Sequence, residues 1–352
     1  MINWFSIIQR VAAGADSSLD NLYRRFFTPG SLQVLPFRGY ANQQTAFLKG
    51  RVLEPKQYGE ADKNASTLRN LQDMFNRLES DELAFCPVEI RFNDQTFQVQ
   101  ADEEGYVSIE LPLADTETYG WLEATLSIPA SASPSGKRID SIGSILQPHP
   151  ETPLGVISDL DDTILKSYVQ NPLKLATELL LKNAATRKAF EGASDLYQKL
   201  HVGKDNALPR PMFYLSSSPW NIYDFLCEFL ALNQLPIGPL FLKDYGFDTD
   251  KFFSGGHNKH KLSNIKKLAE AYPKMSFILI GDSTQRDAEI YTLAAEKFSR
   301  RIAAIYIRDV ANKHDSSEFR QYKDRCAAEG VEFMPFQHSS EVEAHAVKKG
   351  WI

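Results

Sequence analysis

The stretch "VISDLDDTIL", residues 156–165, sets a run of apolar residues directly against three carboxylates, those of Asp159, Asp161 and Asp162. An almost unbroken apolar run such as "LGVIS" is typical of a strand that is covered on both faces. Several carboxylates in one crevice repel one another unless a cation lies between them. The stretch therefore predicts a buried strand that ends at a charged site.

The chain from residue 151 to residue 352 repeats this pattern of strands and helices. Helical stretches near residues 171–200, 219–233, 260–272 and 286–299 alternate with the apolar strand candidates "LGVISD", "MFYLSS", "GPLFL", "FILIGD" and "RIAAIYI". Such alternation implies a parallel sheet with helices on both faces. In these sheets ligands bind beyond the carboxyl ends of the strands. We therefore predict an α/β domain over residues 151–352.

The chain before this domain has a different character. Residues 31–135 hold short runs of alternating apolar residues separated by turn signals, which predict a small antiparallel β-sandwich with one helix near residues 66–78. The run "PASASPSGKRIDS" is rich in Ser, Pro and Gly, so we expect a linker over residues 136–150. Residues 1–30 are predicted to form a helical segment. The turn and strand of "DEEGYVSIEL" resemble those of transthyretin-like sandwiches, which implies a binding or spacing module.

Composition limits the class of protein. The 352 residues suggest two domains, since a domain usually takes roughly 100 to 200 residues. A net charge of −6 argues against a nucleic-acid-binding protein, which needs a clustered excess of Lys and Arg. The three cysteines are far apart and lack metal-ligand spacing, which favours a reducing compartment over a disulfide framework: Cys86, Cys227 and Cys326.

The sequence contains no apolar run of membrane-spanning length, and its first residues lack a basic leader, so we expect a cytoplasmic protein. The segment "MINWFSIIQRV" can still form one apolar helical face. Such a face either packs on the body of the protein, which we favour, or lies on a membrane surface as a peripheral contact.

Polar residues follow four of the predicted strands. Asp159 and Asp161 follow the first, Ser216 the second and Asp282 the fourth. Carboxylates that share a crevice call for a hard divalent cation with oxygen ligands, and Mg²⁺ fits best because no His or Cys stands at ligand spacing. Asp309 follows the fifth strand, where a structural capping role is the preferred interpretation.

Phosphoryl transfer needs this pattern of carboxylates. With Mg²⁺ present, Asp159 can attack phosphorus as a nucleophile and form an aspartyl-phosphate. Asp161, two residues on, can donate a proton to the leaving oxygen and later take one from water. Thr163 can orient the loop and help to bind phosphate oxygens. Asp162 is interpreted as a turn or capping residue.

The motifs resemble those of the haloacid dehalogenase superfamily. "DLDDT" is similar to its first motif, Ser216 in "FYLSSSP" to its second, and Lys261 in "HNKHKLSNI" to its third. Asp282 and Asp287 in "LIGDSTQRD" resemble its fourth, acidic motif. The resemblance implies that Ser216 and Lys261 hold the phosphoryl group, with Lys259 as the rival of Lys261. It also implies a Mg²⁺ site made by Asp159, Asp282 and the backbone carbonyl of Asp161, which Asp287 supports directly or through another ligand.

A narrower resemblance covers most of the chain. "SDLDDTI", "YLSSSPWNIYDFL", "GPLFLKDYG" and "FILIGDSTQRDAEIY" are similar to the catalytic domain of the actin-patch-associated phosphatidate phosphatases, whose motifs are related to those of lipins. Lipins carry Gly at the position of Asp162. The resemblance implies a phosphorylated lipid substrate, with phosphatidate hydrolysed to diacylglycerol and phosphate. The alternatives are a phosphatase for a phosphoprotein or sugar phosphate, and a non-catalytic scaffold.

Side chains near the motifs leave further roles open. The insert after the first motif is too short for a large cap, so we expect an open site that suits a bulky substrate. Its leucines at 179–181, with Trp220 and Tyr223, are candidates for acyl-chain contacts, although core packing is the favoured interpretation. His257 and His260 flank Lys261 and can line the phosphate site or act as caps or surface residues.

Overall fold

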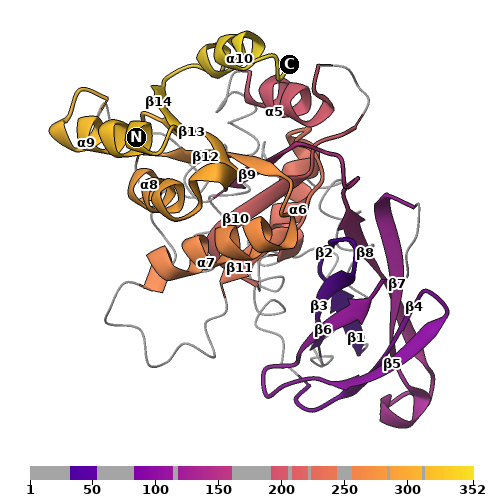
Figure 1. The fold of residues 1–352 in the computed structure, drawn as a ribbon. Coiled ribbons are helices and arrows are strands. Elements are labelled where there is room, and N and C mark those ends of the chain that lie inside the picture. Colours follow the sequence, from indigo (N-terminus) through magenta and orange to yellow (C-terminus); the bar gives the residue numbers. More distant parts are fainter. Residues whose placement is uncertain are drawn as a thin grey trace, which may run out of the picture.

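The structure is a computed structural model. It describes residues 32–53, 83–113, 118–160, 192–204, 208–220, 223–243, 256–283, 286–310 and 314–352. In this part of the chain the strands form two sheets, an eight-stranded sheet from the N-terminal half and a six-stranded sheet from the C-terminal half (Figure 1). The predicted helices at 1–30 and 66–78 lie outside the described residues.

The N-terminal sheet is almost entirely antiparallel. Its strand order is β1-β3-β2-β8-β7-β4-β5, β6 pairs with β3, and the pair of β2 with β8 is parallel. The strand β1 also contacts β7 and β8, so the sheet folds back around one apolar core. The strands are β1 (Gln33–Pro36), β2 (Gly39–Ala41), β3 (Thr45–Leu53), β4 (Pro87–Phe92), β5 (Gln95–Gln100), β6 (Tyr106–Pro112), β7 (Gly120–Ile128) and β8 (Ile139–Gln147).

One of these strands lies where the sequence predicted a linker. The strand β8 occupies most of residues 136–150 and pairs with β7 from Gly120↔Gln147 to Ile128↔Ile139. Its glycine serves close packing rather than flexibility, because a Cβ at Gly143 would lie 3.0 Å from Pro36 Cβ and 3.1 Å from Leu126 Cδ1. The Ser-, Pro- and Gly-rich run ends where this strand begins, and most of the predicted linker range is a strand of the sheet.

The C-terminal sheet is parallel throughout, as the alternating pattern predicted. Its order is β11-β10-β9-β12-β13-β14, with the first strand, β9, between β10 and β12. All six residues of β9 are buried, as expected for a strand covered on both faces. The strands are β9 (Leu154–Asp159), β10 (Met212–Pro219), β11 (Leu240–Lys243), β12 (Ser276–Asp282), β13 (Ile302–Arg308) and β14 (Glu332–Phe336), of which β14 was not predicted.

Helices cover both faces of this sheet, and each face has its own apolar core. Side chains of α5, α6 and α10 belong to one core, and side chains of α7, α8 and α9 belong to the other. The helices are α5 (Ala193–Val202), α6 (Tyr223–Leu232), α7 (Gly256–Ala271), α8 (Asp287–Phe298), α9 (Ser317–Ala328) and α10 (Ser339–Lys348). Among the described residues, no helix is long and apolar enough to cross a membrane.

The two sheets pack against each other through aromatic residues. The ring of Phe37 stacks on Trp220 at 4.3 Å and lies 4.7 Å from Tyr223. The buried hydroxyl of Tyr272 donates a hydrogen bond to the carbonyl of Ala41 at 3.0 Å. Trp220 and Tyr223 therefore take part in packing, the favoured interpretation of both, while residues 179–181 lie outside the described part.

Candidate active site

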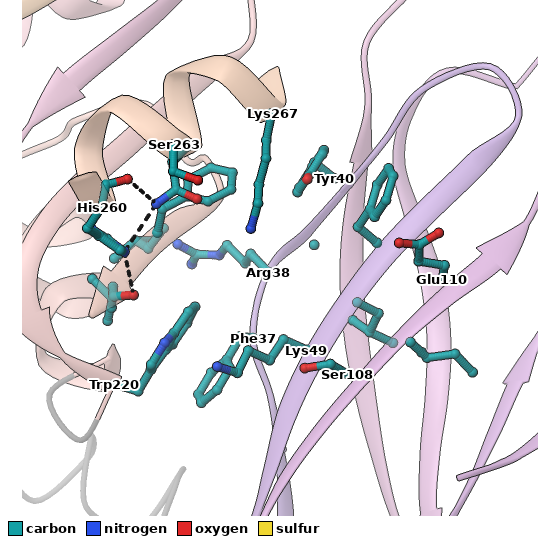
Figure 2. A pocket seen from close by; sticks show the side chains of 18 residues that line it. Phe37, Arg38, Tyr40, Lys49, Ser108, Glu110, Trp220, His260, Ser263 and Lys267 are labelled. Carbon is teal, nitrogen blue, oxygen red and sulfur yellow. Dashed lines mark hydrogen bonds between the residues drawn. The ribbon is translucent and has the colours of Figure 1, made fainter. Parts of the chain in front are cut away.

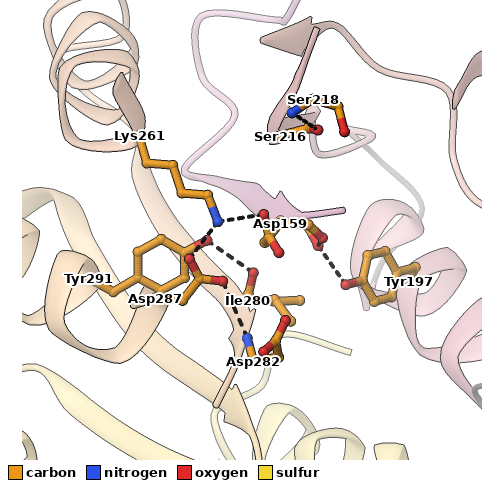
Figure 3. A network of polar contacts seen from close by, with 10 residues as sticks. Asp159, Tyr197, Ser216, Ser218, Lys261, Ile280, Asp282, Asp287 and Tyr291 are labelled. Atoms are coloured by element: carbon orange, nitrogen blue, oxygen red, sulfur yellow. Dashed lines mark hydrogen bonds and ion pairs between the residues drawn. The ribbon is translucent and has the colours of Figure 1, made fainter. Parts of the chain in front are cut away.

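Three carboxylates meet at the carboxyl edge of the parallel sheet. Asp159 ends β9, Asp282 ends the neighbouring β12, and Asp287 begins α8. Each offers an oxygen that lies within 4.8 Å of the others (Figure 3). All three residues are buried, with 4%, 4% and 0% of their surface exposed. The strand order explains the meeting, because β9 and β12 are paired and end at the same edge.

Lys261 joins two of these carboxylates. Its Nζ lies 2.6 Å from Asp159 Oδ1 and 2.6 Å from Asp287 Oδ1, and only 1% of the residue is exposed. The side chain reaches the site from α7, whose next two turns pack Ile265 and Leu268 into the core. The structure thus places Lys261 in the predicted site. The side chain of its rival, Lys259, lies outside the described residues.

The start of α8 is fixed to the end of β12. The backbone N–H of Asp282 donates to Asp287 Oδ2 at 3.4 Å, and the hydroxyl of Tyr291 donates to the carbonyl of Ile280 at 3.2 Å. A Cβ at Gly281 would lie 2.6 Å from Asp287 Oδ2 and 2.8 Å from Tyr291 Cε2. Only glycine leaves room for this contact, so the position of Asp287 depends on Gly281.

The electrostatics of the cluster favour a cation. Burial raises the pKa of Asp287 well above its usual range, the charges of Asp159 and Asp282 raise it further, and Lys261 opposes them. Three carboxylates thus bring negative charge together in a buried place, beside the ammonium group of Lys261. A divalent cation would balance this charge, and a set of carboxylate oxygens alone suits a hard ion such as Mg²⁺.

Ser216 lies beside the nucleophile candidate. Leu215 of β10 pairs with Asp159, so Ser216 stands one residue beyond the partner of Asp159. Ser216 is fully buried, and its Oγ accepts a hydrogen bond from the backbone N–H of Ser218 at 3.0 Å (Figure 3). The last residues of β10 thus hold the hydroxyl at the same edge of the sheet. Asp161 and Thr163 lie outside the described residues, so their roles remain predictions.

Other side chains near this edge have structural roles. Asp309 Oδ2 accepts from the backbone N–H of His314 at 2.9 Å and lies 2.6 Å from its Nδ1. This contact raises the pKa of His314 and agrees with the structural interpretation of Asp309. His260 Nε2 lies 3.1 Å from the carbonyl of Leu242 and lines a cavity between the two sheets, a place that the sequence did not predict.

One further contact at the site was missed from the sequence. The hydroxyl of Tyr197, in α5, lies 2.6 Å from Ser158 Oγ, next to Asp159 in the chain. Burial raises the pKa of Tyr197 to about 12, so the phenol stays protonated at neutral pH. No motif marks this tyrosine, because only the packing of α5 on β9 brings it to the site.

Comparison with known proteins supports a phosphatase domain. Residues 154–309 match the family described as the catalytic domain of phosphatidate phosphatase APP1. Phosphatidate phosphatase APP1 of Saccharomyces cerevisiae is 32% identical over 159 residues, which are 45% of this chain and 26% of that protein. An uncharacterised protein of Schizosaccharomyces pombe is 26% identical over 250 residues, 69% of this chain and 40% of that one. The chain thus matches less than half the length of these relatives.

Solved structures add little to this comparison. A carbohydrate acetylesterase from Xanthomonas citri aligns with 7% identity and a TM-score of 0.26, over 77% of this chain and 66% of that one. A likeness at this level carries no argument about function. The match of sequence family and the geometry of the carboxylate cluster agree with each other. Residues 154–309 are therefore similar to the catalytic domain of the phosphatidate phosphatase APP1 family.

Proposed function

We propose that this protein is a Mg²⁺-dependent phosphatidate phosphatase, which hydrolyses phosphatidate to diacylglycerol and inorganic phosphate through an aspartyl-phosphate. One observation carries the proposal: Asp159, at the end of the central strand, is held by Lys261 inside a buried carboxylate cluster. The family of residues 154–309 supports the lipid substrate. The protein would meet this substrate as a cytoplasmic protein at a membrane surface.

The residues present fit a magnesium ion. Asp159, Asp282 and Asp287 would hold it with carboxylate oxygens, and the family resemblance adds the backbone carbonyl of Asp161. When bound, Mg²⁺ would neutralise charge on the phosphate oxygens and orient the phosphoryl group. Asp287 also contacts Lys261 and the backbone of Asp282, so it would position these groups as well.

The chemistry of this chain would proceed in two displacements. A carboxylate oxygen of Asp159 attacks phosphorus while the bond from phosphorus to the lipid oxygen breaks, and Asp161 gives its proton to that oxygen. In the second step Asp161 takes a proton from water as the water oxygen attacks phosphorus. The bond from phosphorus to Asp159 then breaks, which releases inorganic phosphate and restores both carboxyl groups to their starting state.

Lys261, Ser216 and Thr163 would stabilise the phosphoryl group during both steps. The ammonium of Lys261 lies 2.6 Å from the nucleophilic carboxylate, so it is close to the charge that develops on the transferring oxygens. Ser216 is held at the neighbouring strand end by its contact with Ser218. Groups that are already fixed in this way stabilise a transition state without reorganisation.

The substitution Asp159→Asn tests the nucleophile. We expect turnover of phosphatidate in detergent micelles with Mg²⁺ to fall by at least about a thousandfold, because an amide cannot form the aspartyl-phosphate. Circular dichroism and thermal unfolding should show that the variant stays folded. Asp324→Asn is the matched control, since this carboxyl is exposed on α9, and it should retain activity.

Two results would contradict parts of the proposal. Undiminished turnover by the Asp159→Asn variant would exclude Asp159 as the nucleophile. Hydrolysis of phosphoproteins or sugar phosphates, with none of phosphatidate, would exclude the lipid substrate and leave the phosphatase chemistry standing. The wild-type protein should therefore be assayed against all three substrate classes under the same conditions.

A further inference from the structure

A cavity of about 650 Å³ lies between the N-terminal sheet and the catalytic domain (Figure 2). One wall comes from the segment that leads into β2 and from β3 and β6. The other comes from β11, α7 and the residue after β10. The cavity is separate from the carboxylate cluster, and none of Asp159, Asp282 and Asp287 lines it. It therefore offers a second place where a ligand could bind.

Cationic groups dominate the charged lining of this cavity. Arg38, Lys49 and Lys267 line it together with one carboxylate, that of Glu110. Figure 2 shows Arg38 and Lys267 extending into the space between α7 and the N-terminal sheet. Arg38 Nη1 is buried and has no hydrogen-bond partner among the described residues. An unsatisfied buried donor costs free energy, so an acceptor that reaches this guanidinium would be stabilised.

Aromatic groups surround these cations. Lys49 Nζ lies 4.9 Å from the ring centroid of Trp220 and 4.3 Å from that of Tyr106. Phe37 and Tyr40 also line the cavity, beside Phe241 of β11. A ligand here would meet positive charge and apolar rings together. This combination suits a phosphate group attached to an apolar body.

We propose that this interdomain cavity binds the phosphate group of a ligand, at a site distinct from the catalytic carboxylates, with Arg38 and Lys267 as its main contacts. Guanidinium groups bind phosphate oxygens with two parallel hydrogen bonds, and an ammonium group adds a point charge. The phosphate could belong to a soluble phosphate compound or to the headgroup of a phospholipid.

His260 supports a ligand that also carries a hydroxyl. Burial lowers the pKa of His260 to about 4, so its ring is neutral at physiological pH. Its Nε2 lies 3.1 Å from the carbonyl of Leu242 and 3.1 Å from Asn264 Nδ2, and Nδ1 is buried without a hydrogen-bond partner among the described residues. In the tautomer in which Nε2 donates to Leu242, Nδ1 is an acceptor. A hydrogen phosphate or a neighbouring hydroxyl could donate to this nitrogen.

The same helix serves both sites. On α7, Lys261 contacts the catalytic carboxylates, whereas His260, Asn264 and Lys267 line the cavity. Trp220 in the cavity wall follows β10, the strand that carries Ser216. A ligand in the cavity would thus contact two elements that hold catalytic side chains, although its binding can be measured without catalysis.

Binding of radiolabelled inorganic phosphate in equilibrium dialysis tests the proposal. Lys267→Gln should weaken phosphate binding at the cavity by about tenfold, because it removes one charged hydrogen bond. Lys266→Gln is the matched control, since Lys266 is the next residue of α7, is 57% exposed and does not line the cavity. Both variants lose one charge and keep the catalytic cluster, so phosphate bound there contributes equally to both.

A second variant and a second probe complete the test. Arg38→Gln combined with Lys267→Gln should abolish the cavity site, with thermal unfolding as the check on folding.

Flotation with vesicles of phosphatidylcholine, with and without phosphatidate, distinguishes a phospholipid headgroup from a soluble phosphate compound as the ligand. A loss of phosphatidate-dependent flotation in Lys267→Gln identifies a lipid headgroup, and unchanged flotation identifies a soluble phosphate compound. Equal phosphate binding by the Lys266→Gln and Lys267→Gln variants would overturn the proposal, whatever the outcome for Asp159→Asn.

Discussion

At the scale of single residues, Lys261 shows how a charged group can be buried in a stable protein. An isolated ammonium in the interior would carry a large desolvation cost, but here two carboxylates lie 2.6 Å from it. The three groups come from β9, α7 and α8, so the ion pairs also join three elements of the fold. Removal of the ammonium would leave Asp159 and Asp287 facing each other without compensation.

Lys261→Met tests this arrangement because methionine keeps much of the side-chain volume. We expect the free energy of unfolding to fall by about 3 kcal/mol, the usual cost of breaking a buried ion pair on one side. Urea denaturation measures this change, and turnover of phosphatidate should fall as well. Lys266→Met, at an exposed position of the same helix, should change the free energy of unfolding by less than about 0.5 kcal/mol. Equal stability of the two variants would refute the role given to Lys261.

At the scale of elements, the junction of β12 and α8 sets the geometry of the site. The strand ends at Asp282, and the helix begins at Asp287, which accepts a hydrogen bond from the backbone of Asp282. Gly281 makes this close approach possible, since any Cβ there would meet the Asp287 carboxylate. The acidic pair of the fourth motif is therefore held together by a glycine that lies before it.

Gly281→Ala should damage catalysis more than a comparable clash elsewhere in the sheet. The added methyl would push Asp287 and Tyr291 away, at a cost of about 1 to 3 kcal/mol in stability and with a clear fall in kcat. Gly155→Ala is the control. A Cβ there would lie 2.8 Å from Met275 Sδ, at the start of β9 and away from the carboxyl ends of the strands, where the carboxylate cluster lies. Thermal unfolding would measure the loss of stability, and steady-state kinetics would measure the fall in kcat. The same kcat in both variants would show that Gly281 does not position Asp287.

At the scale of the whole molecule, Phe37 joins the two sheets. The residue is 1% exposed, and its ring lies near Tyr106 of the N-terminal sheet and near Trp220 and Tyr223 of the C-terminal domain. The backbone N–H of Arg38 donates to the hydroxyl of Tyr223 at 2.7 Å in the same region. Buried contacts of this kind couple the folding of the two parts.

Phe37→Ala should therefore destabilise the whole protein. We expect the free energy of unfolding to fall by about 3 to 5 kcal/mol, because the change leaves a cavity among aromatic rings. Denaturation followed by circular dichroism and by tryptophan fluorescence should give one transition in the wild type. Phe97→Ala, at a half-buried position of the edge strand β5, should cost less. Two separate wild-type transitions, or no loss of stability in the Phe37→Ala variant, would contradict the coupling.

The sequence by itself determined the parallel sheet and most of the candidate site. Apolar strands show their burial directly, and parallel strands end at one edge, so Asp159, Ser216 and Asp282 could be brought together before any coordinates were known. Lys261 and Asp287 followed from the order of the motifs. The Ser-, Pro- and Gly-rich run at residues 129–141 was misleading, because it lies mainly before β8, and β8 itself fills most of the range predicted to be a linker.

Only the tertiary structure decided which groups touch across large separations in the chain. The ion pairs of Lys261, the contact of Tyr197 with Ser158 and the glycine beneath Asp287 depend on how helices pack on the sheet. The cavity lined by Arg38 and Lys267 depends on how two domains pack together. Local patterns report burial and strand ends, whereas these contacts arise from packing between segments that no local pattern relates.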